Sequence, residues 1–496
     1  MTETTELTNE DRIFLNLVKD AFLANPFSEK RKNLDKELAQ SSGESKEQII
    51  EKLVFKVQQK LKEFKSRGIK SILNIHKKDR ELFEIFILFN FFYLYRKEID
   101  THILEQINQD EKILKISFAQ QAKEDLENWG FSSKEIQSCF EEAFQLRRAF
   151  FFIKTNIIGK SPVMKQLRRD LWDNIFTHDL YIYRKYLKNR MEDFSTLILG
   201  KTGTGKGAAA AAIGRSGYIP FDMKKLRFEE SFTSSFFPIN LSQFPATLIE
   251  SELFGHRKGS FTGAVDNYDG VFKRCSPHGS IFLDEIGDVS LPVQVKLLQV
   301  IQDRFFYPVG SYKTERFYGR VVAATNMDIN RLREEGHFRD DFFYRLCSDV
   351  IKVPTLYERI QSDKEELTDL ISFLIKRILG KESLELLEMV LDVIDKRLGS
   401  SYPWPGNVRE LEQCIRSVFI KKDYPGNFKS AKQSFENQIF ENFKNGTISA
   451  QDLVNGYCKI LYNRHNTFEE VAKRTCLDRR TVNKYIKESE KIICQQ

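Results

Sequence analysis

The feature that most constrains this chain is a short apolar stretch that runs into a glycine-rich loop and then into a run of alanines. The apolar residues 196–199 predict a strand, and residues 207–213 predict a helix. Glycines between them let successive backbone N–H groups point inward at an anion, and the helix adds its positive N-terminal end. Such a unit favours an α/β fold built on a parallel sheet, with a phosphate site at the end of one strand.

The chemistry of this loop is that of a nucleotide site. Lys206 stands where its ammonium can reach the β- and γ-phosphates. Gly207 departs from the general pattern, because Ser or Thr at this position would offer a hydroxyl to Mg²⁺. Metal binding would then depend on a carboxylate elsewhere and on water. Taken alone, the loop also fits a glycine-rich turn without a ligand. The residues expected to bind the nucleotide here are Gly200, Lys201, Thr202, Gly203, Thr204, Gly205, Lys206 and Gly207.

Polar side chains follow two further apolar stretches, and they strengthen the prediction of a nucleotide site. Asp284 and Glu285 come directly after residues 281–283, and Asn326 follows residues 321–324 at a distance of two positions. Ligands collect at the carboxyl ends of parallel strands. Asp284 can hold Mg²⁺ there, directly or through water, and Glu285 can orient and deprotonate an attacking water. Two acids after a strand are often only a helix cap, but three strand ends that converge on one phosphate predict ATP and Mg²⁺.

Residues 157–419 resemble the central domain of the sigma-54-dependent transcriptional activators, also called bacterial enhancer-binding proteins, of the AAA+ ATPase class. Residues 158–164 are similar to the entry motif of that family, residues 200–206 to its Walker A loop and residues 281–288 to its Walker B segment. The most diagnostic segment is similar to the GAFTGA loop that contacts sigma-54, with serine in place of the alanine at its second position. This segment comprises Gly259, Ser260, Phe261, Thr262, Gly263 and Ala264.

The resemblance implies roles for five further side chains. Asn240 matches the asparagine that restrains the catalytic glutamate until ATP is sensed, and Asn326 matches the sensor I residue. Arg339 and Arg345 match the arginine fingers that reach the γ-phosphate of a neighbouring subunit, and Arg409 matches the sensor II cation. A guanidinium stays charged, and its planar fork fits phosphate oxygens. Fingers supplied by a neighbour imply a homo-oligomer, which we expect to be a hexameric ring.

The resemblance also implies a domain organisation. Residues 156–360 would form the α/β AAA+ subdomain, a parallel sheet flanked by helices, and residues 361–425 a helical lid. Residues 1–155 show apolar residues at helical spacing and predict an all-α regulatory domain. Its many aromatic residues predict mainly core, with a ligand pocket as the alternative. Residues 168–194 look longer than the family norm, which indicates either a spacer or a contact surface for the amino-terminal domain.

The carboxyl end predicts a DNA-binding domain. Residues 426–446 would be a linker, and residues 447–496 a helix-turn-helix similar to the Fis-type tail of the same family. Ala472, Leu477, Val482 and Ile486 are spaced to form its small core. A solvated helical hairpin is the alternative. The residues expected to face the major groove or its phosphates are Arg479, Arg480, Thr481, Asn483 and Lys484.

Composition narrows the setting of the protein. A chain of 496 residues with a net charge of +7 has only a modest positive excess, so a nucleic-acid surface must be local. Seven cysteines without metal-ligand spacing fit free thiols in a reducing cytoplasm. The first residues are polar and acidic, unlike a secretory signal, and the longest apolar stretch, residues 82–94, is too short for a membrane span. We therefore expect a cytoplasmic protein without a membrane partner.

These features predict an ATP-dependent transcriptional activator. It would bind double-stranded DNA upstream of a promoter, hydrolyse ATP in a ring, and remodel sigma-54 RNA polymerase through Phe261 and Thr262. One alternative is a DNA-binding regulator whose nucleotide site gates assembly without hydrolysis, which Gly207 and Ser260 favour. Another alternative is an AAA+ remodeller of some other protein.

Overall fold

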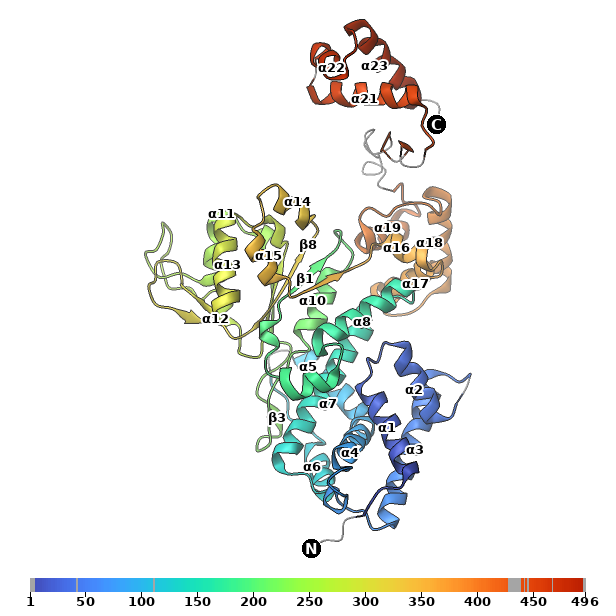
Figure 1. Cartoon of the computed structure of the whole chain (residues 1–496), viewed down its shortest axis with the longest axis vertical. Coiled ribbons are helices and arrows are strands. Elements are labelled where there is room, and N and C mark those ends of the chain that lie inside the picture. The colour runs from blue at the N-terminus through green and yellow to red at the C-terminus, as the bar shows by residue number, and fades with distance from the viewer. Residues whose placement is uncertain are drawn as a thin grey trace. The chain divides into compact units, whose positions relative to one another are not determined.

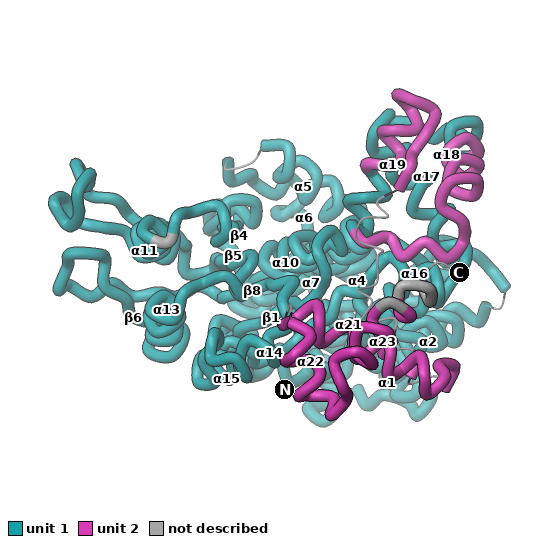
Figure 2. The backbone as a smooth tube through the Cα atoms, turned by 90° about the horizontal axis from the view of Figure 1, so that it is seen from above, with its two compact units in different colours: residues 1–387, 406–412 teal, residues 388–405, 413–496 magenta. Residues whose placement is uncertain are grey.

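The structure, a computed structural model, describes residues 5–41, 43–109, 112–426, 439–440, 442–443, 446–465 and 467–493. Its contacts divide the chain into two compact units, residues 1–387 with 406–412 and residues 388–405 with 413–496 (Figure 2). Most of the predicted linker, residues 426–446, lies outside the described residues. None of the described helices is both long and apolar enough to cross a lipid bilayer.

The first unit is built around a five-stranded parallel sheet with the strand order β4, β5, β8, β1, β9. The predicted strand 196–199 is β1, and the two apolar stretches with polar ends are β5 and β8. These strands are nearly continuous apolar runs because both faces of a parallel sheet are covered. The predicted α/β core is therefore confirmed. The strands are β1 (Thr196–Leu199), β4 (Phe236–Asn240), β5 (Ser280–Asp284), β8 (Arg320–Thr325) and β9 (Asp349–Lys352).

Alternate residues of each strand enter two different hydrophobic cores, because successive side chains of a strand point to opposite faces. Ile198 and Val322 belong to a core that includes residues of α8 (Pro162–Phe176) and α10 (Lys206–Gly214). Leu197 and Ala323 belong to a second core. In Figure 1 the helices of this second core lie on the other side of the sheet from α8. They are α11 (Ala246–Phe254), α12 (Val271–Arg274), α13 (Leu291–Asp303), α14 (Ile329–Glu334) and α15 (Asp340–Leu346).

The amino-terminal residues form helices whose core is continuous with the first face of the sheet. The apolar stretch 82–94 lies within α4, where Phe83, Phe86 and Phe89 are fully buried. The longest helix, α7, contacts both α5 and α10. Phe140 of α7 stacks on Phe221 with 4.7 Å between ring centroids. The helices are α1 (Asn9–Leu23), α2 (Glu29–Ala39), α3 (Lys46–Ser66), α4 (Arg80–Leu94), α5 (Arg96–Gln109), α6 (Ala119–Asn128) and α7 (Ser133–Asn156), with the short η1 (Ile72–Asn74).

The segment before β1 contacts the amino-terminal helices. It comprises α8, the short α9 (Leu180–Ile182), η2 (Tyr183–Leu187) and η3 (Met191–Asp193). Tyr183 is buried, and its hydroxyl donates a hydrogen bond to Gln145 of α7 at 2.9 Å. Arg184 and Lys188 form ion pairs with Glu142 and Glu141 of the same helix. Of the two readings of residues 168–194, the contact surface is therefore the one that the structure favours.

Helices follow the sheet to the carboxyl end. In the second unit, the last three helices enclose a small core of Cys458, Leu461, Val471, Val482 and Ile486, against which Ala472 and Leu477 pack. The four residues that the sequence places in this core are therefore all part of it or packed on it. These helices are α16 (Leu356–Ser362), α17 (Glu366–Leu379), α18 (Leu384–Arg397), α19 (Asn407–Lys421), α21 (Ala450–His465), α22 (Phe468–Thr475) and α23 (Arg479–Ile493).

Short antiparallel pairs complete the first unit. They are β2 (Phe221–Asp222) with β3 (Arg227–Phe228), and β6 (Phe305–Phe306) with β7 (Glu315–Arg316). Phe221 and Phe228 are buried against α7, whereas the β6–β7 hairpin exposes Tyr312 completely at its tip.

Candidate functional site

The glycine loop connects β1 to α10 and has the backbone conformation that an anion-binding loop needs. Gly203 and Gly205 have φ angles of 79° and 104°, a region that side-chain-bearing residues rarely adopt. A Cβ atom at Gly203 would also lie 2.2 Å from the carbonyl oxygen of Gly406. Lys206 is buried, and its ammonium donates to the carbonyl oxygen of Gly200 at 2.9 Å. The side chain of Lys206 is thus folded back over the glycine loop, where a bound phosphate would also lie.

The start of α19 fastens the glycine loop from the outside. The buried amide of Asn407 donates to the carbonyl oxygen of Thr202 at 2.9 Å, and its oxygen accepts from the backbone N–H of Leu356 at 2.9 Å. The N–H of Val408 donates to Gly203 at 3.1 Å. Arg409 is exposed, and its Cβ would lie 3.0 Å from a Cβ at Gly203. The predicted sensor II arginine therefore lies directly beside the glycine loop.

Asn326 links the ends of β5 and β8 to the glycine loop. Its amide nitrogen donates to the hydroxyl of Thr202 at 2.9 Å and to Glu285 at 3.4 Å. Its backbone N–H donates to the other oxygen of Glu285 at 3.3 Å. Asp284 ends β5 and accepts from the N–H of Glu285 at 3.1 Å. Three predicted site residues from three segments therefore meet at one edge of the sheet, as the convergence of strand ends predicts.

Glu285 has an unusual backbone conformation. Its φ of 56° and ψ of 48° lie in the left-handed region. This conformation costs a residue other than glycine about 1 kcal/mol or more. Residues held in such strained conformations cluster at functional sites. The turn directs the carboxylate of Glu285 toward Asn326 instead of along the strand.

Asn240 lies at the same edge but has a different partner. It is paired with Asp284 in the register of β4 and β5. Its side-chain oxygen accepts from the N–H and the hydroxyl of Ser242, at 3.0 and 2.8 Å. Within the described residues it makes no hydrogen bond to Glu285. In this structure Glu285 is bound by Asn326, and the restraint of the glutamate by Asn240 that the family resemblance implies stays a prediction.

The edge of the sheet offers few protein oxygen atoms that could bind a hard cation such as Mg²⁺. Asp284 is half-buried and has free acceptor capacity beside the glycine loop. A Cβ at the exposed Gly207 would meet only the ring of Phe282, at 4.0 Å, so packing does not exclude a hydroxyl-bearing residue there. The described residues contain no cluster of three or more His, Cys, Asp or Glu side chains that could enclose a metal. This donor set fits Mg²⁺, which keeps several waters and binds to phosphate.

The segment 259–264 forms an exposed turn held by main-chain hydrogen bonds. Gly259 and Gly263 have φ angles of 79° and 104°, and the N–H of Gly259 donates to Ala264 at 2.8 Å. The side chain of Phe261 is 36% exposed, and its ring makes an edge contact with His256, 4.9 Å between centroids. Thr262 is exposed. Phe261 is thus available at the surface and is not part of the hydrophobic interior.

The β6–β7 hairpin braces this turn from the side. The N–H of Arg257 donates to Val309 at 3.0 Å, and the N–H of Val309 donates to Gly255 at 2.8 Å. Ser260 packs on Gly310, where an added Cβ would lie 2.5 Å from the Cβ of Ser260. The hydroxyl of Ser260 is buried there and has no hydrogen-bond partner among the described residues. Serine at this position therefore gains no polar contact from its hydroxyl.

The two predicted finger arginines lie at the surface near α15. Arg339 is exposed and forms an ion pair with Asp341, 2.7 Å between the guanidinium and the carboxylate. This pairing raises the pKa of Arg339 above its usual value. Arg345 is exposed, and its side chain has no ion pair within the described residues. Within the described residues, neither side chain forms a hydrogen bond or ion pair with the glycine loop of its own chain.

Two residues that the sequence analysis did not single out hold these parts in place. Asn407 lies two positions before the predicted sensor II residue Arg409, and its hydrogen bonds in the structure give it the role of a clamp. Gln294 of α13 is fully buried, donates to His337 at 2.9 Å and accepts from the N–H of Arg339 at 3.0 Å. A buried glutamine on an otherwise apolar helix face is the signal that could have identified it.

The predicted DNA-contacting residues all lie in the first two turns of α23. Arg479, Arg480, Asn483 and Lys484 are exposed, and Thr481 is half-buried. Asp478 caps the helix by accepting from the N–H groups of Arg480 and Thr481, at 2.9 and 3.0 Å. Arg479 forms an ion pair with Glu469 of α22 at 2.8 Å. Lys484 forms a longer ion pair with Glu488 at 3.9 Å, so the exposed face is basic and two of its cations are already paired.

Comparisons with known proteins agree with this geometry. Residues 173–352 match the family model of the sigma-54 interaction domain, which is an AAA+ ATPase. Over 287 residues the chain is 41% identical to the Nif-specific regulatory protein of Azotobacter vinelandii, a match that covers 57% of this chain and 48% of the relative. It is 36% identical over 265 residues to the DNA-binding transcriptional regulator NtrC of Azospirillum brasilense, covering 53% and 47% of the two chains. The chain thus spans about half the length of these curated relatives.

Among solved structures, NtrX from Brucella abortus in complex with ATP aligns with 75% of this chain and 80% of its own. The TM-score is 0.41 and the sequence identity 19%, values too low to inform function.

Proposed function

We propose that the protein uses residues 173–352, which match the sigma-54 interaction domain, to couple ATP hydrolysis to the opening of promoters held by sigma-54 RNA polymerase. The observation that carries the proposal is the connection of Thr202, Asn326 and Glu285 at one sheet edge. It ties a prospective catalytic carboxylate to the loop that would hold the phosphates. The same domain exposes Phe261 in the turn expected to meet sigma-54.

In this proposal each residue at the edge of the sheet has a separate role in ATP hydrolysis. The N–H groups of the loop and the ammonium of Lys206 bind the β- and γ-phosphates. Asp284 would hold Mg²⁺, and the ion would supply charge neutralisation during phosphoryl transfer. Glu285 accepts the proton of the attacking water, and Asn326 keeps the carboxylate oriented while contacting the loop. Arg409 lies beside the loop, where its guanidinium can compensate charge on the phosphates.

The catalytic site is completed by a second copy of the chain. Arg339 and Arg345 are exposed, and neither forms an ion pair with the glycine loop of its own chain, which suits a role at a neighbour's γ-phosphate. Pairing of Arg339 with Asp341 would be exchanged for phosphate on assembly. We propose a closed homo-oligomer, with six subunits as the expected number.

The carboxyl-terminal helices would hold double-stranded DNA. Arg480, Asn483 and Lys484 are exposed on α23, the helix expected to enter the major groove. Residues 1–155 would regulate the ATPase, because their core is continuous with one face of its sheet.

Two substitutions separate hydrolysis from promoter opening. Glu285→Gln should lower phosphate release at least about 100-fold while ATP still binds, because a general base contributes that much. Thr262→Ala should leave phosphate release unchanged and abolish open-complex formation with purified sigma-54 RNA polymerase. Thr155→Ala, at an exposed threonine of α7, is the matched control and should change neither quantity. Open-complex formation by Thr262→Ala at the native level would overturn the role of the turn.

A second candidate function is a DNA-binding regulator in which nucleotide only gates assembly. Gly207 favours it, because this residue offers no hydroxyl to Mg²⁺ although there is room for one. Phosphate release measured against protein concentration distinguishes the two functions. An ATPase completed by its neighbour gains specific activity as the concentration rises, whereas a gate releases no phosphate at any concentration.

A further inference from the structure

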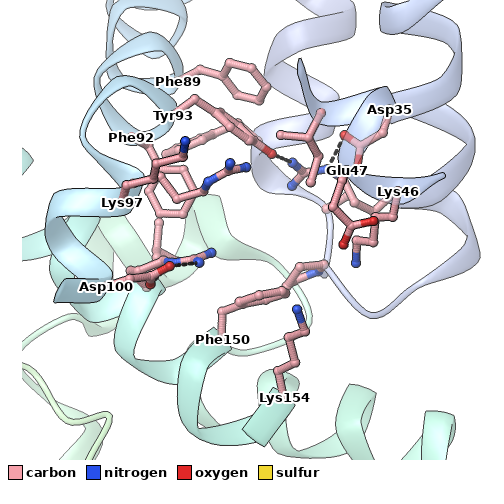
Figure 3. Close-up of a pocket in the computed structure, with 18 of the residues that line it drawn as sticks. Asp35, Lys46, Glu47, Phe89, Phe92, Tyr93, Lys97, Asp100, Phe150 and Lys154 are labelled. Carbon is pink, nitrogen blue, oxygen red and sulfur yellow. Dashed lines mark hydrogen bonds and ion pairs between the residues drawn. The ribbon is translucent and has the colours of Figure 1, made fainter. Parts of the chain in front are cut away.

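The amino-terminal helices enclose a pocket that the proposed ATPase does not use. Its volume is about 390 Å³, within the range of small-molecule sites. α2, α3, α4, α5, α7 and α8 contribute residues to its wall. Figure 3 shows side chains from these helices converging on one space, with Phe150 and Lys154 rising from α7. The pocket lies wholly within the first unit of the chain.

Aromatic and apolar side chains form the inner wall. Phe22, Phe89 and Trp172 are buried, and Phe92 and Phe150 are half-buried at its edge. Phe27 stacks on Phe150 with 5.3 Å between ring centroids and an interplanar angle of 13°, which fixes the orientation of this ring. An inner wall of this kind favours a ligand with a planar or apolar body.

The charges of the wall are unevenly balanced. Six cationic and four acidic side chains line the pocket. Arg31 is paired with Asp35 at 2.7 Å, and Arg147 holds Asp100 in a two-point contact with both distances at 2.5 Å. Tyr93 accepts a further hydrogen bond from Arg31. These pairs are internally satisfied and leave an excess of positive charge on the remaining wall. The cations without an ion pair among the described residues are Lys46, Arg96, Lys97 and Lys154.

Three cations gather around the Phe150 ring. The ammonium groups of Lys46 and Lys154 lie 5.7 and 5.9 Å from its centroid, and the guanidinium of Arg147 lies at 5.0 Å. In Figure 3 Lys46 and Lys154 extend from opposite sides into the same space. Partial desolvation lowers the pKa of Lys46, and the nearby charge of Lys154 lowers it further. Two like charges held this close are relieved by an anion placed between them.

We propose that this pocket binds a small organic anion whose planar or apolar body packs between Phe92, Phe150 and Trp172. Its acidic group, a carboxylate or sulfonate, lies between Lys46 and Lys154. A free inorganic phosphate would leave the aromatic wall uncovered, and a neutral aromatic compound would leave the two ammonium groups uncompensated. The inference goes beyond the proposed ATPase and does not depend on it, because binding is measured without nucleotide.

Two fluorescent probes with the same rings test both parts of the proposal. Anilinonaphthalene sulfonate carries an acidic group, and phenylnaphthylamine lacks it. In the full chain without nucleotide, we expect the sulfonate to bind one saturable site at least about tenfold more tightly than the neutral amine. Equal affinities, or no saturable site, would overturn the assignment.

Substitutions then locate the site. Lys46→Gln combined with Lys154→Gln should weaken the sulfonate about tenfold and leave the neutral amine within about twofold. Both lysines are exposed, so the variant should fold. Lys65→Gln is the matched control, because Lys65 lies 5.0 Å from the ring of Trp129 outside the pocket. A sulfonate affinity that is unchanged in the double variant, or equally weakened in the control, would contradict the proposal.

Discussion

The glycine loop and the turn 259–264 are both bounded by glycines, yet they are held in opposite ways. Side chains from distant segments fasten the glycine loop, with Asn407 on one side and Asn326 on the other. The turn relies on main-chain hydrogen bonds and on one edge contact between Phe261 and His256. A site that orients phosphates gains from rigid geometry. A surface that must meet a partner can be held more loosely. Substitutions of residues that support the glycine loop should therefore lower stability or activity much more than substitutions in the turn.

The largest effect is expected at the buried ion pair that supports the nucleotide end of the domain. Glu366 is fully buried, pairs with Arg359 at 2.7 Å, and accepts from the N–H groups of Lys160 and Ser161. Glu366→Ala should lower the free energy of unfolding by about 3–5 kcal/mol, because it leaves a buried cation unpaired. Chemical denaturation measures this loss. Glu365→Ala, at the exposed neighbouring position, is the control and should cost little. Similar losses in both variants would contradict the role of the pair.

The Asn407 clamp comes next. Asn407 has a φ of 54°, so alanine loses two hydrogen bonds and also strains the backbone. Asn407→Ala should destabilise the protein by about 3 kcal/mol. Asn407→Gly removes the strain but not the loss of hydrogen bonds, so it should cost less. Thermal unfolding of the two variants separates the contributions. If the glycine variant were as stable as the native protein, the hydrogen bonds to the loop would contribute nothing.

A smaller effect is expected at the link between the carboxylate and the loop. Asn326→Ala should lower the rate of ATP hydrolysis about 10–100-fold, because Glu285 loses the hydrogen bond from the side-chain amide and with it the link to Thr202, although the backbone N–H of residue 326 still donates to the carboxylate. ATP affinity should change much less. Asn330→Ala, at an exposed asparagine of α14, is the control for hydrolysis. A loss of ATP binding equal to the loss of rate would mean that Asn326 acts on the loop and not on the carboxylate.

The smallest effect is expected in the turn. Ser260→Ala removes a buried hydroxyl that has no partner among the described residues. It should leave stability unchanged or raise it by about 1 kcal/mol, with ATP hydrolysis unaffected. A loss above about 1 kcal/mol in thermal unfolding would show that the hydroxyl is bound in solution, and the contrast between the two regions would weaken.

The same contrast explains what could be predicted from the sequence. The strand ends were predictable, because apolar runs followed by Asp284 and Asn326 imply a parallel sheet with a polar edge. The core of the last three helices was also predictable from the spacing of Val482 and Ile486. Glu285 was predicted as a site residue, but its left-handed backbone was not, because no local residue pattern requires it.

Contacts between distant segments account for the rest. Asn407 reaches Thr202 across 205 positions, and Asn326 donates to Glu285 across 41 positions. The spacing of residues along the chain does not indicate which distant side chains come into contact. The pocket beside Phe150 is only the alternative interpretation of the sequence, because aromatic residues at helical spacing predict mainly core. Only the unpaired lysines around that ring distinguish a pocket wall from an interior.

The contacts of α7 determine at which residue a truncated form of this protein can begin. Its inner side donates from Gln145 and Arg148 to the carbonyl groups of Ser216 and Gly217, in the turn that follows α10. Phe140 and Phe144 cover the β2–β3 pair. A truncation after residue 155 would therefore strip an apolar surface from the ATPase and invite aggregation, which could be mistaken for loss of regulation. A shortened protein that begins before Ser133 would keep this cover, although it would still lose the contacts of Phe140 with Phe91 and of Phe144 with Phe118.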